Sequence, residues 1–130
     1  MSLSTDRPEL PLAFRKTVEL EKMLHKCMEE VHVNETTVDM ERRAVTKILV
    51  QQHFQLGEPE YNLHKLAVMI GRLQGSKDQM QGIYMECNKI SHRTEDEIKI
   101  PLRRLFTQID ELEKKVDHTI VLVRHFLSRI

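Results

Sequence analysis

The residues best suited to chemistry in this chain are its histidines and the carboxylates placed about one helical turn from them. Glu21, His25 and Glu29 follow one another at steps of four, so a helix would carry all three on one face, and Glu29 and His32 form a Glu-x-x-His motif. Paired motifs of this type hold di-metal centres in four-helix bundles. The sequence has no second Glu-x-x-His. We therefore predict a solvated helix face here and no metal site.

Two further histidine arrangements have residue types found in catalytic or metal sites. His118 and His125 are seven residues apart and share a helix face, but two nitrogens cannot complete a zinc shell. Glu60 lies one turn from His64, yet no nucleophile or cleft-forming motif accompanies the pair. The sequence also has no phosphate-binding loop or nucleophile elbow. We predict no catalytic residue, no metal and no cofactor, and so no enzyme.

The two cysteines and the N-terminal segment bear on the compartment. Cys27 and Cys87 occupy helical positions among Leu and Met, which favours two buried thiols, while a structural disulfide stays open. Residues 1–14 lack the basic and apolar runs of a signal peptide. Apolar runs such as Ile120–Val123 are far shorter than a membrane span. We therefore expect a cytoplasmic protein.

Composition favours helices and a protein partner. The chain has 20 basic and 20 acidic side chains and a net charge of zero, so it lacks the basic excess of a nucleic-acid-binding protein. Hydrophobic residues make up 40% and aromatic residues only 5%, with four Gly and four Pro. Few turn residues and much Leu, Met, Glu and Lys are typical of long helices and unlike a β-sandwich.

Four positions interrupt the helical pattern. Asn34 is either an N-cap that starts a new helix or a brief kink within one longer helix. Gly57, two residues before a proline, is the strongest breaker, and we expect the chain to reverse there. The serine after Gly75 begins a capping box, which is a signal for a new helix. However, hydrophobic residues keep their steps of three and four through this glycine and serine, which favours one helix. At Pro101 the hydrophobic phase shifts, so we predict that the last helix starts or kinks there.

These interruptions predict an all-α fold. We expect an antiparallel bundle of three to four long helices with coiled-coil-like packing, forming a single domain over residues 9–130 after a flexible N-terminal arm, residues 1–8. The expected helices cover about residues 10–33, 35–56, 59–97 and 101–130.

The last predicted helix carries the most regular pattern in the chain, a heptad repeat in which only Thr119 is not hydrophobic. After Lys115 the stripe broadens, because hydrophobic residues also flank the seam. A broad stripe needs more than one neighbouring helix. The seam comprises Leu102, Leu105, Ile109, Leu112, Val116, Thr119, Val123, Phe126 and Ile130. The predicted partner interface is its C-terminal half, with Val116, Ile120, Val123, Phe126, Leu127 and Ile130.

The sequence thus predicts a non-catalytic interaction subunit of scaffold or adaptor type. It would pack through its terminal helix with itself, as an oligomer, or with a helical protein partner in a larger intracellular complex. The alternative is a bundle that binds a small apolar ligand or lipid in a cavity lined by Met and Leu. Arg124, His125 and Arg129 interleave with the apolar stripe, as at membrane surfaces. The chain has helices of its own to cover that stripe, so we do not predict membrane contact.

Overall fold

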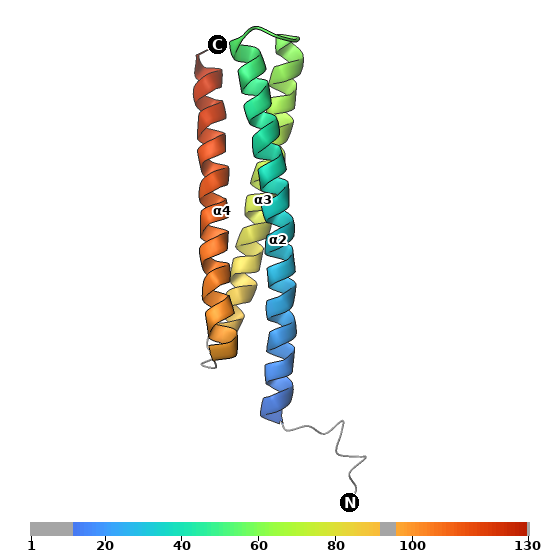
Figure 1. Ribbon diagram of the computed structural model, residues 1–130, viewed down its shortest axis with the longest axis vertical. Helices are drawn as coiled ribbons and strands as arrows, with labels where there is room; N and C mark the ends of the chain where they lie inside the picture. Colours follow the sequence, from blue (N-terminus) through green and yellow to red (C-terminus); the bar gives the residue numbers. More distant parts are fainter. Residues whose placement is uncertain (1–11, 92–95, 130) are drawn as a thin grey trace, which may run out of the picture.

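Three long helices form the described part of the chain. The computed structural model describes residues 12–91 and 96–129, with side chains from residue 18 onward. The helices are α2 (Leu12–His53), α3 (Pro59–Ile90) and α4 (Asp96–Ser128). Consecutive helices run in opposite directions, so α2 and α4 point the same way (Figure 1). The all-α prediction is confirmed, with three packed helices. The predicted arm, residues 1–8, lies outside the described residues.

Helix α2 is one continuous helix where two were predicted. The side chain of Asn34 does not cap a new helix but donates from Nδ2 to the carbonyl oxygen of Glu30, one turn earlier, at 2.9 Å. This local bond satisfies the amide in a helix interior, and Asn34 is buried there. The predicted separation of helices 10–33 and 35–56 is therefore wrong, and the alternative of one longer helix holds.

The reversal predicted at Gly57 is confirmed, and side chains fix it. Gln55 and Gly57 adopt positive φ angles of 56° and 79°, which turn the chain sharply after α2. Asn62 Nδ2 donates to Gln52 Oε1 at 3.0 Å and to the Leu56 carbonyl oxygen at 3.3 Å. The turn is therefore tied to both helices that it joins.

Helix α3 runs through Gly75 without interruption, as predicted, but it ends at Ile90 and not at residue 97. Helix α4 then begins at Asp96, five residues before the predicted start at Pro101. Pro101 lies inside the helix and cannot donate to the carbonyl of Glu97. Two features offset this loss: acidic residues occupy the first turn, where the helix dipole favours them, and Ile98 is fully buried there.

One hydrophobic core joins the three helices, and a polar contact fixes each pair. Arg42 Nε donates to Thr119 Oγ1 at 3.1 Å between α2 and α4. Lys77 Nζ lies 2.7 Å from Asp117 Oδ1 between α3 and α4. Asn62 and Gln52 provide the α2–α3 contact described above. The core takes in the heptad seam of α4 from Leu102 to Val123, including Thr119. Coiled-coil-like packing of these seams stays a prediction.

Candidate functional site

The residues predicted to contact a partner divide into buried and accessible groups. Val116, Ile120 and Val123 are at most 6% exposed and belong to the chain's own core. In this conformation α2 and α3 cover them, so they offer no surface to another molecule. Phe126 is half-buried, and Leu127 is exposed. Ile130 lies outside the described residues. The accessible part of the predicted interface is thus the last two turns of α4.

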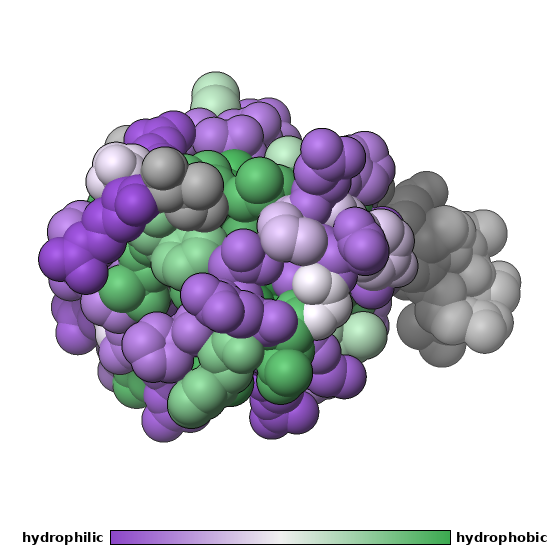
Figure 2. Space-filling view, turned by 90° about the horizontal axis from the view of Figure 1, so that it is seen from above, coloured by the Kyte–Doolittle hydropathy of each residue, from purple (hydrophilic) through white to green (hydrophobic). Residues whose placement is uncertain are grey.

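Those turns lie at the end of the bundle that also carries the α2–α3 turn, here called the upper end (Figure 1). It comprises residues 50–61 and 121–129. Among the described residues, seven of the fourteen large hydrophobic side chains that are exposed lie in these 21 positions. Seen from this end, apolar surface interrupts the hydrophilic surface over the helix ends (Figure 2). The seven are Val50, Phe54, Leu56, Tyr61, Val121, Leu122 and Leu127.

The local backbone explains why the most prominent of these side chains cannot turn inward. Phe54 follows the last residue of α2, and its N–H still donates to the Val50 carbonyl at 3.1 Å, so its direction is set by the helix. Its ring is 66% exposed and packs edge-on against His53, with 5.0 Å between ring centroids. Leu56, 58% exposed, sits in the turn that Asn62 holds. The upper end therefore presents apolar side chains on a fixed backbone.

A groove between α2 and α4 adjoins the upper end. It has a volume of about 470 Å³, and Leu49 and Leu122 line its upper part. Its lower part is polar, with Arg42, Arg43 and His118. The apolar surface thus continues a short way down one side of the bundle, where basic and imidazole groups bound it.

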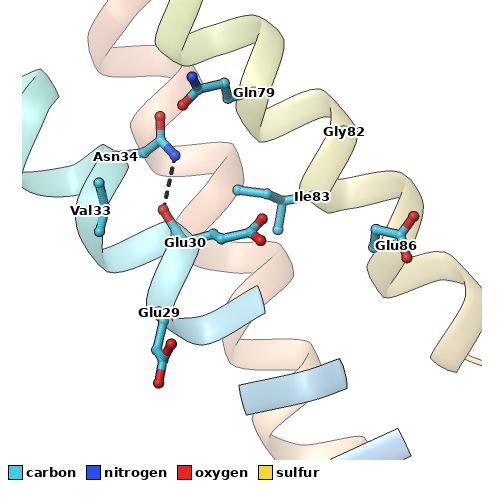
Figure 3. Close-up of a pocket in the computed structure, with 8 residues that line it drawn as sticks. All are labelled: Glu29, Glu30, Val33, Asn34, Gln79, Gly82, Ile83 and Glu86. Carbon is cyan, nitrogen blue, oxygen red and sulfur yellow. Dashed lines mark hydrogen bonds between the residues drawn. The ribbon is translucent and has the colours of Figure 1, made fainter. Parts of the chain in front are cut away.

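A second groove, between α2 and α3, is acidic. It also measures about 470 Å³ and includes Val33 and Ile83 with three glutamates (Figure 3). The absence of a side chain at Gly82 leaves room on the α3 side. Its exposed lining is mainly apolar and has glutamates among it, but it contains neither Met nor Leu, which the predicted ligand cavity would have. Its polar residues are Glu29, Glu30, Asn34, Gln79 and Glu86.

The histidine motifs do not assemble into a site. Across residues 18–91 and 96–129, no three His, Cys, Asp or Glu side chains lie close enough together to hold a metal ion. The histidines of the motifs are all exposed, and Glu29 faces the acidic groove without His25 or His32. The exposed histidines are His25, His32, His64, His118 and His125.

The structure brings together two groups whose pairing the sequence leaves open. Cys27 on α2 and Cys87 on α3 are both buried, and their side chains lie close enough for each to influence the pKa of the other. Burial raises the pKa of Cys27, and burial with the neighbouring Cys27 sulfur raises the pKa of Cys87 to about 12. A signal was present in the sequence: each cysteine lies thirty residues from Gly57, where the chain reverses.

Comparison with known proteins provides no family for this chain. No protein-family model matches it, and no curated protein or solved structure is significantly similar to it. Within the described residues, every helix is too polar or too short in its apolar stretches to cross a membrane. Any functional conclusion therefore rests on the surfaces described above.

Proposed function

We propose that this protein is a non-catalytic interaction subunit that associates with a second copy of itself through the upper end of the bundle. The apolar side chains gathered at the upper end carry this proposal. Exposed apolar surface that clusters, and is not scattered singly, is typical of protein contact sites. The cytoplasmic location stays a prediction.

Two features support a second copy as the occupant. The chain has zero net charge, so long-range repulsion does not oppose the approach of two copies. The upper end also combines aromatic and aliphatic side chains with few charges, and such a patch can pack against itself about a two-fold axis. Phe54 and Leu127, on different elements, are the two anchors that we expect to matter most.

Sedimentation equilibrium tests the association directly. We expect a species of twice the 15.4 kDa chain mass that dissociates on dilution. Burying one large apolar side chain contributes about 1.5–3 kcal/mol, and a dimer of identical chains carries each substitution twice, so Phe54→Ser and Leu127→Ser should each weaken the dimer by roughly 100-fold or more.

Val33→Ser and Met40→Ser are the matched controls. Their side chains are 62% and 64% exposed, as much as that of Phe54, but they lie along α2 away from the upper end. Neither control should change the dissociation constant. A chain that stays monomeric at high concentration, or controls that weaken association as much as Phe54→Ser does, would show that the upper end does not join two copies.

A further inference from the structure

The two buried cysteines lie near the opposite end of the α2–α3 hairpin, and the helix register places them face to face. Cys27 lies 25 residues before Gln52 on α2, and Cys87 lies 25 residues after Asn62 on α3. Gln52 and Asn62 are hydrogen-bonded at 3.0 Å across the two helices. Because α2 and α3 run in opposite directions (Figure 1), equal steps from this bond bring both cysteines to one level.

Two independent observations support this register. Twenty-five residues are close to seven full turns of 3.6 residues, so each cysteine returns to the face of its helix that carries the Gln52–Asn62 bond. Between the Gln52–Asn62 bond and the cysteines, Glu41 Oε1 and Arg72 Nη1 lie 3.3 Å apart. This ion pair shows that α2 and α3 keep nearly the same register there. The two thiols are also close enough to influence each other's pKa, and their residues are at most 4% exposed.

The spacing of packed helices suits a covalent bridge between these positions. Helix axes in contact lie about 8–10 Å apart, and Cα atoms sit about 2.3 Å from each axis. Facing Cα atoms are therefore roughly 3.4–5.4 Å apart, which overlaps the 4.4–6.8 Å or so that disulfides span. A bond between the two sulfurs is therefore compatible with the usual spacing of two packed helices.

We propose that Cys27 and Cys87 form an oxidative modification site, at which a low-molecular-weight disulfide such as oxidised glutathione introduces an intramolecular disulfide between α2 and α3. This inference does not rest on the proposed function, because the site and the upper end lie at opposite ends of the hairpin.

The exchange proceeds in two balanced steps. The thiolate of Cys27 attacks one sulfur of the glutathione disulfide, the S–S bond breaks, and one glutathione thiolate leaves. The thiolate of Cys87 then attacks the Cys27 sulfur of the mixed disulfide and releases the second glutathione. Both cysteines lose a proton and are oxidised by two electrons together, and the glutathione disulfide is reduced to two thiols.

Burial makes this reaction slow in the closed bundle. The raised pKa values leave little thiolate at neutral pH, and the oxidant must reach sulfurs that solvent does not touch. Cys87 lies three residues before the end of α3, so fraying of the last turn of α3 moves Cys87 aside and uncovers Cys27 opposite it without unfolding the bundle. The oxidation rate should therefore rise with pH and with mild denaturant.

The test treats the purified full chain with oxidised glutathione at mildly alkaline pH and follows mass, free thiols and melting temperature. We expect a mass loss of about 2 Da, simultaneous loss of both free thiols, and one proteolytic peptide pair joined through Cys27 and Cys87. Closing this long loop should raise the melting temperature by about 10 °C, and dithiothreitol should reverse the shift.

Two variants separate a facing pair from two merely reactive thiols. In Cys27→Ser the melting temperature should not change on oxidation. In the double variant Cys87→Ala with Ile83→Cys, the second thiol moves about one helical turn along α3, beyond disulfide reach, and no intramolecular bond should form. Retention of two free thiols in the original chain, persistent glutathione adducts, or disulfide-linked dimers would each overturn the proposal.

Discussion

The middle of the bundle and its upper end contain the same kinds of hydrophobic residue but differ in how far they expose them to solvent. In the middle, all three helices are present at each level, and Leu73 and Ile109 are fully buried. At the upper end the helices finish, so Phe54, Leu56 and Leu127 have no fourth element to cover them. The exposure of these three side chains thus follows from where the helices end and not from residue type.

The largest predicted effect contrasts one substitution in the two regions. Leu73→Ala removes a side chain with 0% exposure and leaves a cavity, so it should lower the free energy of unfolding by about 2–5 kcal/mol. Leu56→Ala makes the same chemical change at 58% exposure and should alter it by less than about 0.5 kcal/mol. Urea denaturation of both variants, at a concentration where the protein is monomeric, measures the difference. Equal losses would mean that the upper end is part of the folded core.

The second effect is a loss of stability at high pH that originates in the buried thiols. The folded-state pKa of Cys87 is raised from 9.0 to about 12, so above pH 9 the unfolded chain ionises first and becomes favoured. The contribution of this thiol is intact below pH 9 and is lost as pH rises toward 12. At pH 10.5 the loss should reach roughly 2 kcal/mol, since one pKa unit corresponds to about 1.4 kcal/mol.

The variant with both cysteines changed to alanine isolates the contribution of the thiols to the pH dependence of stability. It lacks the ionisable groups, so its unfolding free energy should fall less between pH 8 and pH 10.5 than that of the original chain. The raised pKa of Lys77, caused mainly by its hydrogen bond to Asp117, is common to both proteins and cancels in the difference. Parallel pH curves for the two proteins would contradict the prediction.

The sequence predicted the middle of the bundle well and the ends of the helices poorly. The heptad of α4 was sufficient to predict that its seam residues from Leu102 to Val123 are buried, because hydrophobic residues at steps of three and four form a seam that packs against another helix. Asn34 and Pro101 gave wrong boundaries. An amide can bond to its own helix, and a fully buried Ile98 can hold a helix turn against the cost of a proline.

The candidate sites depended on information that periodicity does not contain. An apolar stripe shows that one face of α4 must pack against other helices, but not whether these helices belong to this chain or to another. In the structure, α2 and α3 of the same chain bury Val116, Ile120 and Val123. The exposure of Phe54 follows from the position of the turn, and the meeting of the cysteines from the register set by that turn. Both become predictable once the reversal at Gly57 is known.

Glycines in the two regions should respond oppositely to alanine. Gly75 lies in the middle of α3, and an added Cβ would meet nothing within 4 Å, so Gly75→Ala should raise the unfolding free energy by about 0.5–1 kcal/mol through helix propensity. Gly57 has a φ of 79° in the turn, where an L side chain is strained, so Gly57→Ala should lower it by about 1 kcal/mol. Thermal unfolding of both variants gives the signs. A loss at Gly75 would mean that α3 is not a regular helix there.

The smallest predicted effect concerns the ion pair that links α3 to α4 in the middle of the bundle. Lys77 Nζ lies 2.7 Å from Asp117 Oδ1, but the Asp117 side chain is 54% exposed, so water and salt screen the attraction. A double-mutant cycle with Lys77→Ala and Asp117→Ala should give a coupling of about 0.2–0.5 kcal/mol, falling further in 1 M salt. A coupling above about 2 kcal/mol that resists salt would show that polar contacts hold the middle of the bundle together. The small value expected would leave hydrophobic burial as the feature that distinguishes it from the upper end.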